Sequence, residues 1–123
     1  MLLAVAEHKH IQSDIIPRIA TGFCSGMART GGMCGAVSGG IMAIGLSLGR
    51  ASPNEAIDPC YQAVQAFLER FSVKFNSLSC LELTGAHLGT PEGQAVFIEK
   101  GQIKQCTDYV GEATQMVVEI VGG

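Results

Sequence analysis

Apolar residues recur three and four positions apart in two long stretches of the chain, which places them on one face of an α-helix. In residues 57–75 this face comprises Ile57, Cys60, Tyr61, Val64, Phe67, Leu68, Phe71 and Phe75. In residues 103–120 it comprises Ile103, Cys106, Val110, Ala113, Val117 and Ile120. No stretch alternates strictly between apolar and polar residues, as a half-buried β-strand would. Both stretches are therefore predicted to be amphipathic helices.

Shorter helices are predicted from local start signals and apolar spacing. Residues 52–55 and 79–82 both have the pattern of a capping box, in which serine and glutamate side chains satisfy free backbone groups at a helix start. Thr90 followed by Pro91 predicts another helix start. Residues 15–20 and 34–48 are also expected to be helical. We therefore expect an all-α protein that forms a single domain over residues 1–123, an antiparallel bundle of about five to six helices.

Residues 30–49 form a stretch without a charged side chain, which allows two interpretations. A stretch of this length could just span a bilayer, and glycines four apart also occur where membrane helices touch. However, the stretch is rich in glycine and serine, and the other predicted helices are amphipathic. This pattern favours the central helix of a soluble bundle, packed on all sides, and we expect no membrane association.

The composition and the net charge of the chain argue against some classes of function. The chain has 123 residues, a hydrophobic fraction of 47%, a net charge of −3 and no tryptophan. A protein without a basic patch or stacking aromatics has little with which to bind nucleic acid, so nucleic acid is not expected as a partner. Residues 1–6 are apolar but lack the basic start of a secretory signal, and we expect a cytoplasmic protein.

The five cysteines suggest chemistry rather than disulfide cross-links. Their number is odd, no two form a CxxC pair, and cytoplasmic thiols are normally reduced. Their spacing matches no zinc-ribbon or ferredoxin pattern. A free cysteine is also a common core residue, and Cys60, on the apolar face of residues 57–75, is assigned to packing.

Two cysteines lie at predicted helix starts, where the partial positive charge of the helix terminus favours the thiolate. Cys34 follows a run of glycines and lies five residues after Arg29, whose cation would assist ionisation. Cys80 follows Ser79 at the first helical position. We therefore predict that Cys34 ionises readily. Gly35 and Gly39, one helical turn apart, are predicted to admit a neighbouring helix or a bound group beside Cys34.

The order of cysteine motifs resembles a known family. Residues 34–39, CGAVSG, match the pattern CGAxxG, and Cys80 and a single Cys106 follow downstream. This order resembles the C_GCAxxG_C_C family, small bacterial and archaeal proteins to which redox activity is attributed, over about residues 15–121. The resemblance implies that the family's cysteines correspond to Cys34, Cys80 and Cys106.

The chain departs from the family at its beginning. The family has a fourth cysteine on a helix upstream of the glycine-rich segment, and here no cysteine precedes Cys24. We expect an N-terminal helix that is shortened relative to the family. Two alternatives remain open: Cys24 takes the place of the fourth cysteine, or the set is one cysteine short.

Three functions remain as hypotheses. The first is thiol/disulfide electron transfer through Cys34 with Cys80 or Cys106, as in a thiol-based oxidoreductase that serves an unidentified redox partner. The second is a metal ion or iron–sulfur cluster held by the same three cysteines, with Cys24 or His87 as a further ligand. The third is a helical interaction module whose cysteines only pack. Covalent haem is excluded because the chain has no CxxCH. A homo-oligomer is left open.

Overall fold

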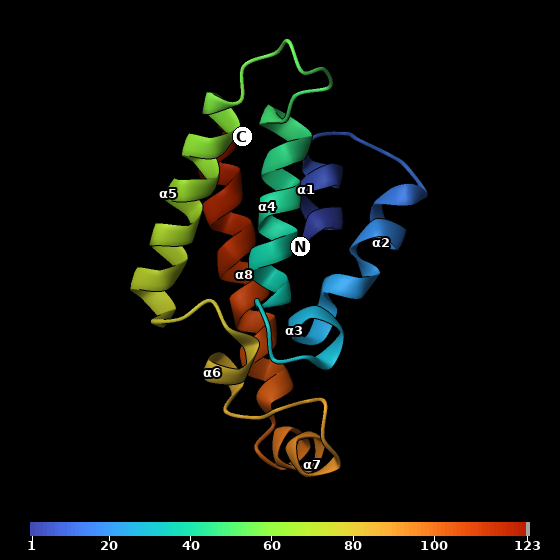
Figure 1. The fold of residues 1–123 in the computed structure, drawn as a ribbon, viewed down its shortest axis with the longest axis vertical. Coiled ribbons are helices and arrows are strands. Elements are labelled where there is room, and N and C mark those ends of the chain that lie inside the picture. Colours follow the sequence, from blue (N-terminus) through green and yellow to red (C-terminus); the bar gives the residue numbers. More distant parts are fainter. Residues whose placement is uncertain (123) are drawn as a thin grey trace.

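The computed structural model describes residues 1–122 and, over that range, contains helices and loops but no β-strand (Figure 1). A short 3₁₀ turn, Thr21–Phe23, precedes α3. The helices are α1 Leu2–His8, α2 Ile15–Ala20, α3 Cys24–Arg29, α4 Gly35–Leu48, α5 Asp58–Phe75, α6 Cys80–Thr84, α7 Pro91–Glu99 and α8 Gln102–Val121. The predicted all-α fold is confirmed, and the number of helices is close to the expected five or six.

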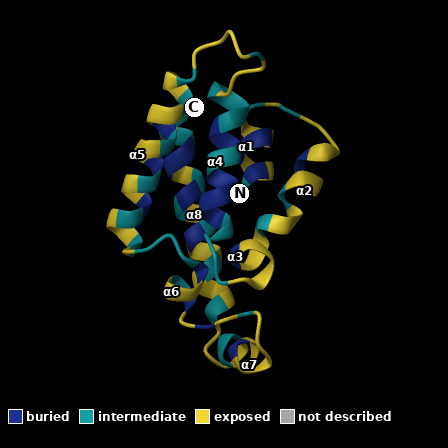
Figure 2. Cartoon of the chain, in the orientation of Figure 1, coloured by how far each residue is buried: buried dark blue, intermediate teal, exposed yellow. Residues whose placement is uncertain are grey.

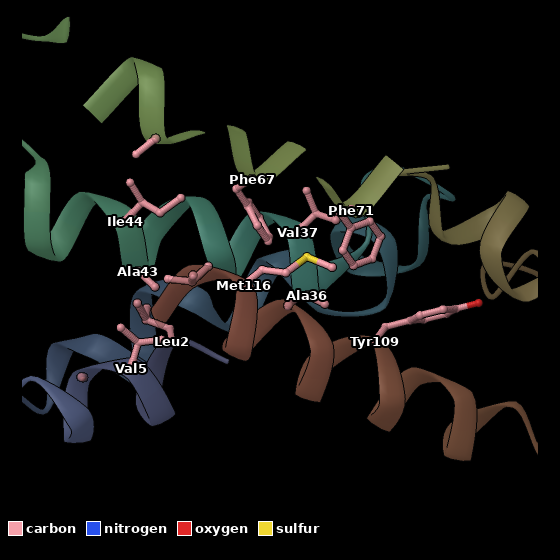
Figure 3. Packing of buried hydrophobic residues seen from close by; sticks show 14 of the residues in the cluster. Leu2, Val5, Ala36, Val37, Ala43, Ile44, Phe67, Phe71, Tyr109 and Met116 are labelled. Carbon is pink, nitrogen blue, oxygen red and sulfur yellow. The ribbon is translucent and has the colours of Figure 1, made fainter. Parts of the chain in front are cut away.

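The core lies between α1, α4, α5 and α8, with α4 in the middle; half of the residues of α4 are buried and none is exposed (Figure 2). The largest fully buried side chains are Val5, Val37, Ile44, Phe67, Phe71 and Val117 (Figure 3). Phe67 packs directly on the backbone of Gly40, where an added Cβ would overlap the phenyl ring. The glycine-rich sequence of α4 therefore lets a large aromatic ring approach the central helix closely.

The two long amphipathic helices occur where apolar spacing predicts them. α5 runs antiparallel to both α4 and α8 (Figure 1), and its buried residues include Phe67 and Phe71. On the outer side of the α5–α8 contact, Arg70 pairs with Glu119 and Lys74 with Glu112, both at 2.7 Å. Water screens these largely exposed pairs, so they contribute little to stability, and burial of the apolar faces holds the helices together.

One predicted helix start is wrong. Residues 52–55 form a turn, in which the Ser52 hydroxyl accepts from the Asn54 N–H at 3.2 Å and the Glu55 carboxylate accepts from the Ala51 N–H at 2.6 Å. In a capping box, Ser52 would accept from the Glu55 N–H and Glu55 from the Ser52 N–H, so the bonds formed here close a turn instead, and α5 begins later, at Asp58. The other two starts are confirmed, because Ser79 and Thr90 cap α6 and α7 with their side chains.

Within the described residues, no helix combines the length and apolar character needed to cross a membrane. α4 has 14 residues and ends at Leu48, before the end of the uncharged stretch. At about 1.5 Å per residue it is shorter than the hydrocarbon thickness of a bilayer.

Candidate cysteine site

Cys34 and Cys80 are fixed beside each other by a short backbone pairing. An isolated antiparallel bridge between Met33 and Ser79 joins the segments that lead into α4 and α6. In its two hydrogen bonds, both 2.8 Å long, the backbone N–H groups of Cys34 and Cys80 each donate to a carbonyl oxygen of the opposite segment. Cys34 is the N-cap of α4, and Cys80 is the first residue of α6. The starts of the two helices therefore meet at one end of the bundle, next to α3 (Figure 1).

Four of the five cysteines line a single cavity of about 300 Å³. They come from separate parts of the chain: Cys24 from the start of α3, Cys34 and Cys80 from the starts of α4 and α6, and Cys106 from the first half of α8. All are free thiols. Cys60, which was assigned to packing, lies on α5 and does not line this cavity.

The cavity walls are mainly apolar. Among the described residues that line it, no side chain is charged. The large wall residues are Met1, Leu2, Phe23, Leu83, Leu88, Phe97, Ile103, Tyr109 and Val110. Such surroundings solvate a thiolate poorly, so they favour the neutral thiol.

The expectation that Cys34 ionises readily is wrong, because burial raises the pKa of its thiol. The backbone N–H groups of Ala36 and Val37, in the first turn of α4, act to lower this pKa, but the effect of burial is larger. Neither forms a hydrogen bond of ordinary geometry with the sulfur. Arg29 is exposed and makes no contribution to the pKa of Cys34. The start of α4 therefore acts to lower the pKa of Cys34, as predicted, but burial in the cavity raises this pKa by more.

Three of the cavity cysteines interact electrostatically. Burial is the main cause that raises the pKa of Cys80 and of Cys106. Repulsion by the charge of Cys34 raises the pKa of both further, and Cys80 also acts on Cys106. Ionisation of one of these thiols therefore disfavours ionisation of the others, as expected for thiols that share one site.

Tyr109 is a site residue that the sequence analysis missed. It is buried, lines the cavity and lies one helical turn after Cys106, beside Phe71 (Figure 3). Its hydroxyl donates a hydrogen bond of 3.1 Å to the carbonyl oxygen of Leu83, and so ties α8 to α6. Burial, followed by the charges of Cys106 and Cys34, raises the pKa of Tyr109. The three-residue spacing from Cys106 was the available signal for this role.

The backbone beside Cys80 is in an unusual conformation. Residues 25–29 all have φ between 57° and 69°, so α3 contains a left-handed turn. Gly26, in this turn, packs on Cys80: an added Cβ would lie 2.5 Å from the Cys80 Cβ and 3.1 Å from its sulfur. Residues with side chains adopt this conformation only at a cost of about 1–2 kcal/mol each. Such strain is concentrated at functional sites in proteins.

A comparison with protein families finds a match over almost the whole chain. The family model described as "Putative redox-active protein (C_GCAxxG_C_C)" matches residues 1–120. The protein belongs to the C_GCAxxG_C_C family. The resemblance recognised in the sequence is thus confirmed, and the family description supports a redox role in general terms. Searches of curated proteins and of solved structures find no match.

The two glycines of the family motif line the cavity and meet close neighbours in this C_GCAxxG_C_C protein. A Cβ at Gly35 would lie 3.4 Å from the carbonyl oxygen of Phe23, in the segment that leads to Cys24. A Cβ at Gly39 would lie 3.1 Å from the Met1 side chain, at the start of α1. The missing side chains therefore let the residues before α1 and α3 approach α4.

The side chains that could bind a metal ion do not converge on one point in the described residues of this C_GCAxxG_C_C protein. Within the part of the chain that the structure describes, no three His, Cys, Asp or Glu side chains are grouped so that they could hold a metal ion. His87 is exposed, accepts a hydrogen bond of 3.0 Å from the Gly89 N–H and does not line the cavity. The side chains as they stand do not fit a single metal ion.

Proposed function

We propose that this protein is a thiol–disulfide redox protein in which Cys34 forms a reversible disulfide with Cys80 or Cys106. One observation carries the proposal: four cysteines from separate segments line one cavity, and three of them interact electrostatically. In the oxidation step, two S–H bonds break and one S–S bond forms. Two electrons and two protons pass to an acceptor.

The backbone supports Cys80 as the first partner to test. The Met33–Ser79 bridge joins the segments that precede Cys34 and Cys80, whereas Cys106 is carried by α8. Burial keeps Cys34 as the neutral thiol, so it loses its proton only as it reacts, and the N–H groups at the start of α4 stabilise the charge that then forms. Cys34 is the member common to both candidate disulfides.

Disulfide mapping tests the proposal. Reduced protein is treated with the thiol oxidant diamide, the remaining thiols are alkylated, and the peptides are analysed by mass spectrometry. We expect a bond between Cys34 and Cys80 or Cys106 that a reductant reverses. Cys60→Ser serves as the matched control and should leave the yield unchanged, whereas Cys34→Ser should abolish the bond. A disulfide that involves Cys60, or only bonds between molecules, would contradict the proposal.

An iron–sulfur cluster is a second candidate because clusters are commonly held by four cysteine thiolates. The ligands of a multi-iron cluster bind different irons, so the requirement that three donors meet at one point does not apply to them. Cys24, Cys34, Cys80 and Cys106 would be the ligands, and the cluster would supply one-electron transfer. The apolar wall would shield it from water.

Reconstitution separates the two candidates. Protein incubated without oxygen with ferrous iron and sulfide should develop visible absorption if the cavity holds a cluster. Cys60→Ser should then behave like the parent, whereas Cys106→Ser should lose the bands. A protein that stays colourless, but forms the Cys34 disulfide, would leave the thiol–disulfide function as the explanation.

A further inference from the structure

The cavity has the size and wall chemistry of a small-molecule site. Its volume of about 300 Å³ is at the lower end of the range for ligand pockets, so it suits a molecule of about one ring. Three aromatic side chains contribute to the wall: Phe23, Phe97 and Tyr109. Ile103, also on the wall, is 66% exposed, and Cys24 is exposed, so the cavity is accessible from solvent.

The wall selects against charged electron acceptors. No charged side chain lines the cavity among the described residues. Glutathione disulfide and nicotinamide or flavin nucleotides carry several charges each, which would lose water here without gaining an oppositely charged side chain. An acceptor that enters this cavity is therefore uncharged.

The polar groups of the cavity wall further restrict which ligands can bind. The hydroxyls of Thr84 and Tyr109 already donate to backbone carbonyl oxygens, Thr84 to that of Cys80 at 2.7 Å and Tyr109 to that of Leu83 at 3.1 Å. The hydroxyl of Ser25 and the S–H groups of Cys34, Cys80 and Cys106 then remain as donors on the wall, and burial raises the pKa of these three thiols, which favours their protonated form. A matching ligand has hydrogen-bond acceptors and no charge.

On the basis of the thiol–disulfide function above, we propose that the cavity binds a small, uncharged quinone and that its cysteines reduce it. A quinone is a flat ring that can pack against aromatic side chains, and it carries two carbonyl acceptors. Cys34 and its partner cysteine lose two hydrogen atoms and form an S–S bond. The two carbonyl groups of the quinone gain these atoms and become the hydroxyls of a hydroquinone. The reaction balances without a further reactant.

Tetramethyl-1,4-benzoquinone is the probe, because its ring positions are all substituted and thiols cannot readily add to the ring. Reduced protein is mixed with it without oxygen, and hydroquinone and remaining thiols are measured. We expect one hydroquinone for each disulfide and a rate that saturates with quinone concentration. Glutathione disulfide should oxidise the protein much more slowly.

Two variants show whether the quinone reaction takes place in the cavity. Val110→Phe narrows the cavity without altering a cysteine, and it should slow the quinone reaction much more than the reaction with hydrogen peroxide, an oxidant small enough to enter the narrowed cavity. Val73→Phe adds the same bulk on the exposed face of α5 and should change neither. Circular dichroism confirms that both variants fold.

The outcomes separate this inference from the function on which it rests. If diamide forms the Cys34 disulfide but the quinone oxidises no thiol, the inference is overturned and the thiol–disulfide function stands. A rate that rises linearly with quinone concentration and is unaffected by Val110→Phe would also overturn it, because the reaction would not need the cavity. If neither oxidant forms the disulfide, the proposed function itself fails.

Discussion

Gly26→Ala tests the left-handed backbone conformation of residues 25–29 and their close contact with Cys80. Gly26 is buried, has a φ of 69°, and its backbone lies against Cys80. Alanine adds one methyl group and no charge, so any loss of stability reports conformation and packing alone. The expected result is a clear decrease in the free energy of unfolding.

The expected change in the free energy of unfolding combines two destabilising effects and one stabilising effect. An alanine in the left-handed conformation costs about 1–2 kcal/mol. Its Cβ would lie 2.5 Å from the Cys80 Cβ, closer than packed atoms tolerate, and relief of such overpacking costs about 1–3 kcal/mol. The less flexible unfolded chain offsets about 0.4–1 kcal/mol. The net destabilisation should be about 1–5 kcal/mol, centred near 3 kcal/mol.

Denaturant unfolding followed by circular dichroism measures this change. Gly111→Ala is the matched control, because Gly111 lies within α8 and an added Cβ would have no neighbour within 4 Å. Replacement of a helical glycine by alanine should stabilise the protein by about 0.5–1 kcal/mol. If Gly26→Ala unfolds at the same denaturant concentration as the parent or as Gly111→Ala, the turn does not have this conformation and its contact with Cys80 is incorrect.

Three further predictions concern the cavity. Tyr109→Phe should lower stability by about 0.5–1.5 kcal/mol in denaturant unfolding, because the partly buried carbonyl of Leu83 loses its donor; an unchanged midpoint would contradict this. Gly39→Leu should cost about 1–3 kcal/mol through overpacking against Met1, and a melting temperature equal to that of the parent would show that the close approach is incidental. Because burial raises the pKa of Cys34 above its ordinary value of 9.0, the folded state holds this proton more tightly than the unfolded state. This contribution to stability should be fully present below about pH 9 and lost as the pH rises through the higher pKa of the folded state. Cys34→Ser should weaken the alkaline loss, and an identical pH profile for both proteins would refute the assignment.

The sequence by itself determined the elements whose signals are local. The apolar spacing of α5 and α8 and the side-chain caps at Ser79 and Thr90 depend on residues within a few turns of each other, and the structure has them as predicted. The order of the motif cysteines was likewise sufficient to recognise the family. The serine–glutamate pattern of residues 52–55 failed because the same two side chains can accept from other backbone N–H groups, those of Ala51 and Asn54, and so close a turn.

Only the tertiary structure decided the chemistry of the site. Cys24 and Cys106 lie far apart in the sequence, and they share a cavity because α3 and α8 pack at the same end of the bundle. The protonation of Cys34 was misjudged because the helix terminus is a local feature, whereas burial depends on the walls that distant segments provide. The roles of Tyr109 and of the left-handed turn arise in the same way. Periodicity and capping act within a few residues of the chain, but the surroundings of a thiol are set by the residues that folding brings next to it.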